Sequence, residues 1–150
     1  EAAWEPLALD DIVAELKNGI WEPYSSQIIY DGVNSRLNAQ TTVMVWLLFN
    51  ELITNAVKHG ALRTRDGDVT ITSRQRQVDE TTWIDLSWRE TVPGGIKSPT
   101  RKGLGSYLIE RAPRLGLSGT GLVRFDPTGV VCEISFPLFG ATHSHLANAA

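Results

Sequence analysis

The chain has 150 residues, the usual length of one domain, and its 42% hydrophobic and 21% charged residues are typical of a soluble globular protein. A formal net charge of -3 provides no basic surface for nucleic acid, which argues against DNA or RNA as a partner. The longest apolar run, residues 43–49, is too short to span a membrane, no signal sequence opens the chain, and the lone cysteine, Cys132, excludes an internal disulfide. We therefore expect a cytoplasmic domain without membrane contact.

The first third of the chain predicts a helix and a short strand. Residues 6–18 have apolar side chains at helical spacing, and Gly19 is placed to end that helix. Residues 27–30 form a brief strand pattern, and Asp31-Gly32 is a typical turn sequence. These elements precede a much longer helix.

The long helix is predicted over residues 40–59. Asn38 can cap its first turn, and Gly60 ends it. Apolar side chains recur at steps of three and four and should face the core: Val45, Leu48, Leu52 and Ala56.

Alternation of polar and apolar residues then predicts four strands in two antiparallel pairs: residues 68–76, 82–89, 121–125 and 130–137. Between the pairs, residues 93–102 have no periodicity and predict a loop, and residues 105–115 restart a helix. Because helices come early and strands late, we expect an α+β fold, a two-layer sandwich of sheet against helices.

Four polar residues lie along one side of the long helix: Glu51, Asn55, Lys58 and His59. A carboxylate and a carboxamide offer the oxygen ligands that Mg²⁺ takes, and an ammonium group one turn further on can meet a phosphate oxygen. The alternative is that this stripe is simply the solvated side of an amphipathic helix.

A second candidate site lies at the end of the strand over residues 82–89. Glu90 follows that strand, and a carboxylate beside an apolar pocket can accept hydrogen bonds from the exocyclic amine of adenine. The alternative is a surface carboxylate at a strand end. Trp88 points to the same face of the strand, and we interpret it as a core aromatic rather than a base-stacking residue.

The third candidate site is the segment Gly103-Leu104-Gly105-Ser106, which directly precedes a predicted helix. Glycines before a helix let backbone N–H groups approach phosphate oxygens, and Lys97, Arg101 and Lys102 add positive charge upstream. A basic loop that only stays solvated is the alternative. No GxxxxGK[ST] sequence occurs, which excludes a P-loop.

Taken in order, ELITNAVKHGAL, DLSWRE, GLGSYLIE and residues 136–138 resemble the catalytic ATP-binding domain of sensor histidine kinases, and the WxE form resembles the HWE branch. The resemblance covers roughly residues 20–138. It implies the Bergerat fold, in which a mixed, mostly antiparallel sheet is covered by helices and nucleotide lies between the first-motif helix and a lid. Two features depart from the family pattern: Asn50 replaces the histidine of the branch, and the glycines after WxE are delayed to Gly94 and Gly95.

The resemblance also implies a role for each matched residue. Glu51 would orient or deprotonate the attacking group, as the catalytic residue of the domain. Asn55 would be the Mg²⁺ ligand and Glu90 the adenine-reading acid. The remaining ATP-binding residues would contact ribose or phosphates: Lys58, His59, Lys102, Gly103, Leu104, Gly105 and Ser106.

The implied function is that of a protein-histidine kinase domain in a two-component system. It would transfer the γ-phosphoryl group of ATP, with Mg²⁺, to a histidine on an adjoining phosphoacceptor helical domain, and a response regulator would act downstream. None of His59, His143 and His145 has the sequence context of a phosphoacceptor, so the substrate histidine should lie outside this chain. The alternatives are an ATP-binding regulatory module without transfer activity and a serine kinase of the anti-sigma type on the same fold.

The domain is expected to cover residues 1–140, and residues 141–150 are expected to form a disordered tail. Since the chain starts at Glu1 rather than at Met, we also expect it to be part of a longer protein.

Overall fold

A computed structural model of the protein describes residues 8–95, 110–111, 114 and 116–138. The named elements within this part of the chain are α1 (Leu9–Asn18), η1 (Glu22–Gln27), β1 (Ile28–Gly32), α2 (Ala39–His59), η2 (Ala61–Arg63), β2 (Asp68–Val78), β3 (Thr81–Thr91), β4 (Thr120–Asp126) and β5 (Gly129–Pro137). The described residues 110–111, 114 and 116 are also helical. The expected tail at residues 141–150, the loop beyond residue 95 and most of the helix predicted at residues 105–115 lie outside the described residues.

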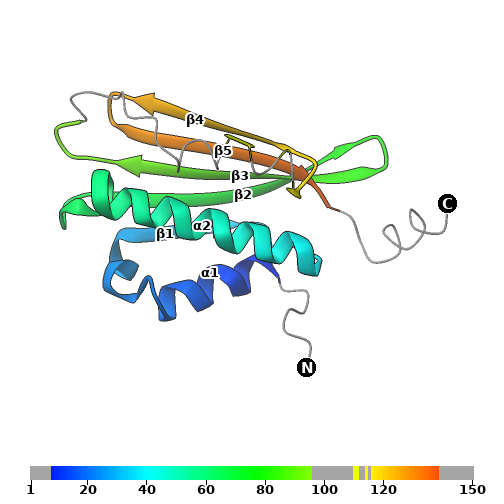
Figure 1. Ribbon diagram of the computed structural model, residues 1–150, viewed down its shortest axis with the longest axis horizontal. Coiled ribbons are helices and arrows are strands. Elements are labelled where there is room, and N and C mark those ends of the chain that lie inside the picture. Colours follow the sequence, from blue (N-terminus) through cyan, green and yellow to red (C-terminus); the bar gives the residue numbers. More distant parts are fainter. Residues whose placement is uncertain (1–7, 96–109, 112–113, 115, 139–150) are drawn as a thin grey trace.

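The five strands form one mixed sheet in the order β1-β2-β3-β5-β4. Only β1 and β2 are parallel, and the other neighbouring pairs are antiparallel. The helices α1 and α2 cover one face of this sheet (Figure 1). The predicted α+β class and the mixed, mostly antiparallel sheet packed on helices are therefore confirmed.

The helix α2 follows the predicted boundaries closely. The Asn38 side chain accepts a hydrogen bond from the Thr41 backbone N–H at 2.8 Å, which satisfies one of the free donors in the first turn. Gly60 is the C-terminal cap.

Among the described residues, none of the helices combines the length and the hydrophobicity that a membrane span needs.

The turn predicted at Asp31-Gly32 is wrong. Both residues continue β1 and pair in parallel with Thr72 and Ser73 of β2. The local turn signal is overridden because the neighbouring strand supplies a hydrogen-bonded partner for each of these residues.

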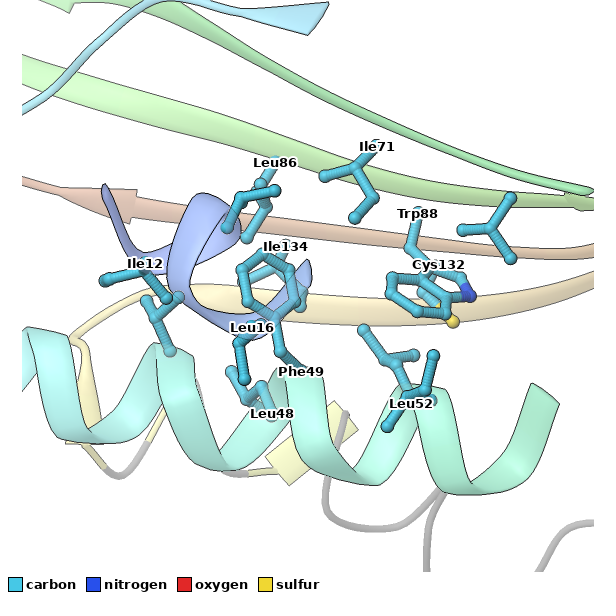
Figure 2. Close-up of a cluster of buried hydrophobic side chains, with 14 of the residues drawn as sticks. Ile12, Leu16, Leu48, Phe49, Leu52, Ile71, Leu86, Trp88, Cys132 and Ile134 are labelled. Atoms are coloured by element: carbon cyan, nitrogen blue, oxygen red, sulfur yellow. The ribbon is translucent and has the colours of Figure 1, made fainter. Parts of the chain in front are cut away.

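The core lies between α2, α1 and the inner face of the sheet. Leu48, Phe49 and Leu52 of α2 point toward Leu86, Trp88 and Ile134 from β3 and β5 (Figure 2). At one end of this core, Trp21, Phe49 and Trp88 form an aromatic cluster with ring centroids 5.5 to 6.3 Å apart. The aromatic cluster buries Trp88 to 1% exposure, as predicted for a core aromatic.

The opposite face of the sheet carries polar and charged side chains. On that face, the two carboxylate oxygens of Asp85 accept hydrogen bonds from Arg76 Nε and Ser135 Oγ, both at 2.7 Å. Such exposed ion pairs contribute little to stability, so the buried apolar face holds the domain together.

Candidate functional site

The polar rim of α2 lies where the sequence placed it. Glu51 and Asn55 are half-buried, and Lys58 and His59 near the end of the helix are exposed. Leu52 and Ala56, on the neighbouring side of α2, are buried in the core. The helix is therefore anchored by its apolar side and presents the four polar groups at its edge.

Hydrogen bonding separates two kinds of polar residue on α2. Asn50 donates from Nδ2 to the Trp46 carbonyl at 3.0 Å, and Thr54 donates from Oγ1 to the Asn50 carbonyl at 2.8 Å, so both are satisfied by their own helix. The side chains of Glu51 and Asn55 make no hydrogen bond to any described residue. Their oxygen atoms are thus left for a partner outside the described fold.

The available oxygens suit Mg²⁺ better than a metal that needs an all-protein site. No group of three or more His, Cys, Asp or Glu side chains able to hold a metal occurs among the described residues. Mg²⁺ commonly takes one or two protein oxygens and fills its octahedron with water and substrate phosphates. The carboxamide oxygen of Asn55, partly exposed and unpaired within the described structure, fits that mode of binding.

The carboxylate of Glu90 connects β3 to the end of α2. Glu90 is only 3% exposed. Its Oε1 accepts a hydrogen bond from the Ala61 backbone N–H at 3.0 Å, and its Oε2 accepts one from Trp88 Nε1 at 2.9 Å. Each oxygen keeps a further lone pair, so a third donor can still bind. The alternative of a surface glutamate is wrong, because the side chain is buried and held on both oxygens.

Gly60 makes room for this carboxylate. Its φ of -128° is open to any residue, so backbone conformation does not require glycine here. A Cβ atom at this position, however, would lie 2.1 Å from Glu90 Oε1. Gly60 was predicted only as the end of the long helix, and its contact with Glu90 is an additional role.

Burial raises the pKa of Glu90, while the hydrogen bonds from Trp88 and Ala61 lower it in part. No ion pair among the described residues includes Glu90. The two N–H donors are therefore what favours the ionised, acceptor-only form of this carboxyl group.

The chain after Glu90 is held against the β4–β5 turn. The Val92 N–H donates to the Thr128 carbonyl at 2.8 Å, and Gly129 approaches so closely that a Cβ there would lie 2.0 Å from the Glu90 carbonyl oxygen. Gly94 and Gly95 have φ values of 81° and 79°, a conformation that favours glycine. The delayed glycines of the WxE motif thus lie in a turn, in which the Gly95 N–H donates to the Val92 carbonyl at 2.8 Å.

The structure brings two of the three predicted sites together. Glu90 accepts a hydrogen bond from Ala61, which lies two residues beyond the end of α2, the helix that carries Asn55. The residues predicted on the phosphate side, Lys102, Gly103, Leu104, Gly105 and Ser106, lie outside the described residues. Sequence reasoning missed the donors to Glu90, because a backbone N–H leaves no signal in the sequence and Trp88 was interpreted by its packing alone.

The raised pKa of Glu90 predicts how stability depends on pH. The folded state keeps the Glu90 proton above its ordinary pKa of 4.5, so the stabilising contribution is complete below that pH and is lost as pH rises through the folded pKa. We expect the unfolding free energy of the unmutated chain, relative to Glu90→Gln, to fall as pH rises above 4.5. Urea unfolding over roughly pH 3 to 8 measures this difference.

Asp85 provides a control of opposite sign. Burial alone would raise its pKa, but the hydrogen bonds from Arg76 and Ser135 outweigh it and hold the pKa below its ordinary value of 3.8. The contribution of the Asp85 carboxylate to the unfolding free energy, measured relative to Asp85→Asn, should therefore be fully present above pH 3.8. It should decrease as pH falls below that value. If the difference in unfolding free energy between the unmutated chain and Glu90→Gln rises with pH, as expected for Asp85, the pKa of Glu90 is not raised in the folded state.

The fold is that of histidine kinase catalytic domains. The structure matches the histidine kinase domain of the Erythrobacter litoralis EL346 blue-light activated histidine kinase with a TM-score of 0.66 and 22% identity, over 97% of this chain and 69% of that one. It matches the catalytic domain of histidine kinase ThkA with a TM-score of 0.63 and 18% identity, over 91% of this chain and 98% of that one. The predicted Bergerat-type architecture is thus shared with known kinase domains.

Sequence comparison leads to particular relatives. The chain is 30% identical over 142 residues to blue-light-activated histidine kinase 1 of Erythrobacter litoralis, covering 89% of this chain and 37% of the relative. It is 25% identical over 135 residues to the blue-light-activated histidine kinase of Brucella ovis, covering 90% of this chain and 28% of the relative. The chain spans well under half the length of both relatives. No protein-family model matches it. In fold and in sequence, the chain resembles the catalytic domain of histidine kinases, as its motifs predicted.

Proposed function

We propose that this domain binds ATP with Mg²⁺ and transfers the γ-phosphoryl group to a histidine on an adjoining phosphoacceptor helical domain of the same protein. The observation that carries the proposal is the buried Glu90 carboxylate, held at the end of the same helix that presents Glu51 and Asn55. This arrangement joins a base-reading acceptor on β3 to the end of the helix that carries the metal-binding oxygen. The histidine kinases among its relatives support the choice of reaction.

Each site residue has a distinct part in the proposed reaction. Glu90 accepts a hydrogen bond from the exocyclic amine of adenine, and Asn55 Oδ1 binds the metal. Lys58 and His59 contact phosphate or ribose. The segment over residues 102–106 contacts the phosphates through backbone N–H groups and Lys102. Bound Mg²⁺ would neutralise charge on the phosphate oxygens.

Glu51 has the catalytic part. A nitrogen of the acceptor histidine forms a bond to the γ-phosphorus as the bond to the β-phosphate oxygen breaks, and ADP leaves. Glu51 orients that imidazole and takes the proton from its other ring nitrogen, which becomes acidic as the N–P bond forms. The half-buried carboxylate makes no hydrogen bond to a described residue, so it is available for this role.

The proposed partners follow from the reaction. After transfer, the phosphoryl group passes to a response regulator. The structural neighbour ThkA, with a TM-score of 0.55 and 16% identity, has been crystallised with the response regulator protein TrrA. We place the reaction in the cytoplasm, with no nucleic acid and no membrane contact by this domain.

A transfer assay tests the proposal. The domain is mixed with Mg-ATP and a separately made phosphoacceptor helical domain, and the product is exposed to acid and to alkali. Phosphohistidine is acid-labile and alkali-stable, and this is the expected product. An acid-stable product would indicate the serine kinase alternative instead. Binding of ATP in a calorimeter without any transfer would indicate the regulatory module.

Replacing Glu51 with glutamine should spare ATP binding and slow transfer by about 100-fold or more, because the amide cannot take up a proton. The measurement is single-turnover transfer at saturating Mg-ATP, alongside calorimetric binding. Glu15→Gln, the same change on the exposed side of α1, is the control and should transfer at the unmutated rate. Equal rates for the two variants would remove Glu51 from the mechanism.

A further inference from the structure

Two buried tryptophans in the aromatic cluster differ in one respect. Trp21 is 0% exposed and Trp88 is 1% exposed, and their rings meet edge-on with centroids 5.9 Å apart. The indole N–H of Trp88 donates to Glu90 Oε2 at 2.9 Å. The indole N–H of Trp21 has no hydrogen-bond partner among the described residues. Only one of the two therefore does more than pack.

The Trp88 hydrogen bond restricts the carboxylate of Glu90. With only the Ala61 N–H at Oε1, the carboxyl group could still rotate about its terminal bond, because that torsion is broad. A second donor at Oε2 fixes its plane, and both donors are part of the packed core. The orientation of the remaining lone pairs is then set by the fold rather than by a ligand.

The same hydrogen bond acts on the protonation state of Glu90. An indole N–H can only donate, so it favours the ionised, acceptor-only carboxylate. A protonated carboxyl group would itself become a donor and would no longer distinguish an amino group from a carbonyl on a base.

Few other groups act on this carboxyl. Burial raises its pKa, and the Ala61 N–H opposes that rise together with Trp88. Cys132 is paired with Trp88 across β3 and β5, and its pKa is raised first by burial and then by the charge of Glu90. Lys58 and His59, at the end of α2, are exposed to solvent and make no ion pair with Glu90.

We propose that Trp88 is a positioning residue for nucleotide recognition, whose indole N–H orients Glu90 to accept from a 6-amino purine and to reject a 6-oxo purine. The inference rests on the proposed ATP-binding function. Through Glu90, Trp88 determines the preference for ATP over inosine triphosphate, which differs from ATP by a carbonyl in place of the exocyclic amine.

The test compares Trp88→Phe with Trp21→Phe. Phenylalanine keeps an aromatic ring in the core and removes the indole N–H in each case, so the two variants are matched in burial and in partner rings. The dissociation constants for Mg-ATP and Mg-inosine triphosphate are measured by calorimetry across pH. Melting curves establish that each variant is folded.

We expect Trp88→Phe to weaken ATP binding by about tenfold or more and to leave binding of inosine triphosphate nearly unchanged. The loss of ATP binding at low pH should begin at a higher pH than in the unmutated chain, because the hydrogen bond that lowers the pKa of Glu90 is gone. Any effect of Trp21→Phe should be the same for both nucleotides. An unchanged ratio of the two dissociation constants in Trp88→Phe overturns the inference.

A measurement on the unmutated chain covers the case in which Trp88→Phe does not fold. The indole N–H resonance of Trp88 should move with the titration of Glu90 and should move again on addition of Mg-ATP, while that of Trp21 does neither. The inference is overturned if the Trp88 resonance shifts neither with the titration of Glu90 nor on addition of Mg-ATP. If the unmutated chain binds no adenine nucleotide but this resonance still follows Glu90, the proposed function fails and the hydrogen bond stands.

Discussion

Replacing Asn55 with alanine is expected to abolish the Mg²⁺ dependence of ATP binding and to leave the fold intact. The side chain stands half-buried on the rim of α2, without a hydrogen bond to any described residue, so its removal leaves no described group unpaired. The helix itself is held by its apolar side, including Leu52 and Ala56. The unfolding free energy should therefore change by no more than about 0.5 kcal/mol.

The effect on binding should be far larger. Mutating a residue that only orients a metal ligand typically lowers metal affinity by about 10 to 100-fold. Loss of the ligand itself should therefore lower the affinity for Mg²⁺ by more than about 100-fold. Calorimetric titrations with ATP, in the presence of Mg²⁺ or of a chelator, measure this directly. ATP binding without metal should be the same in the variant and in the unmutated chain.

Asn50→Ala is the matched control for this prediction. It makes the same change on the same helix, but Asn50 is hydrogen-bonded to the Trp46 carbonyl of its own helix and is not a proposed ligand. Mg²⁺ should strengthen ATP binding in Asn50→Ala by the same factor as in the unmutated chain. If Asn55→Ala behaves likewise, Asn55 is not the metal ligand.

Replacing Gly60 with alanine should weaken both the fold and ATP binding. The added Cβ would stand 2.1 Å from Glu90 Oε1 and 3.2 Å from Ala56 Cα, a backbone atom of α2. The carboxylate must then leave the Ala61 N–H, which becomes a buried donor without a partner. We expect a loss of about 1 to 3 kcal/mol in unfolding free energy and a loss of about tenfold or more in ATP affinity.

Urea unfolding and calorimetry measure these two effects, and Gly19→Ala is the control. Gly19 also caps a helix, α1, but a Cβ there would meet the Glu15 and Leu16 carbonyl oxygens, at 3.1 and 4.0 Å, and no carboxylate. Gly19→Ala should keep full ATP affinity. Equal losses of affinity in both variants would show that the contact between Gly60 and Glu90 does not matter for binding.

Local signals in the sequence were sufficient for most of the fold. The boundaries of α2 were predictable because Asn38 caps its start and Gly60 ends it, while the apolar residues between them keep helical spacing. The strand β1 was harder, because Asp31-Gly32 is a turn signal and only the parallel pairing with β2 shows that the strand continues. Pairing between distant strands leaves no local trace in one sequence.

The candidate site was predictable in its ionisable residues and not in its contacts. Glu90 was identified by its place after a strand and by the WxE motif, yet its two donors come from different origins. One is a backbone N–H at Ala61, 29 residues away in sequence, which any residue except proline could provide. The other is Trp88, whose hydrophobic character hides its single polar atom.

The lone thiol of this domain has a practical consequence. Cys132 is buried beside Trp88 in the sheet, and burial, the largest cause, together with the nearby carboxylates raises its pKa above the ordinary value. A thiol reagent can therefore modify it only when β5 transiently separates from its neighbours, so the rate of labelling reports the free energy of that local opening. Because Cys132 is paired with Trp88 next to the candidate site, comparing its labelling rate with and without nucleotide measures how far binding suppresses this local opening.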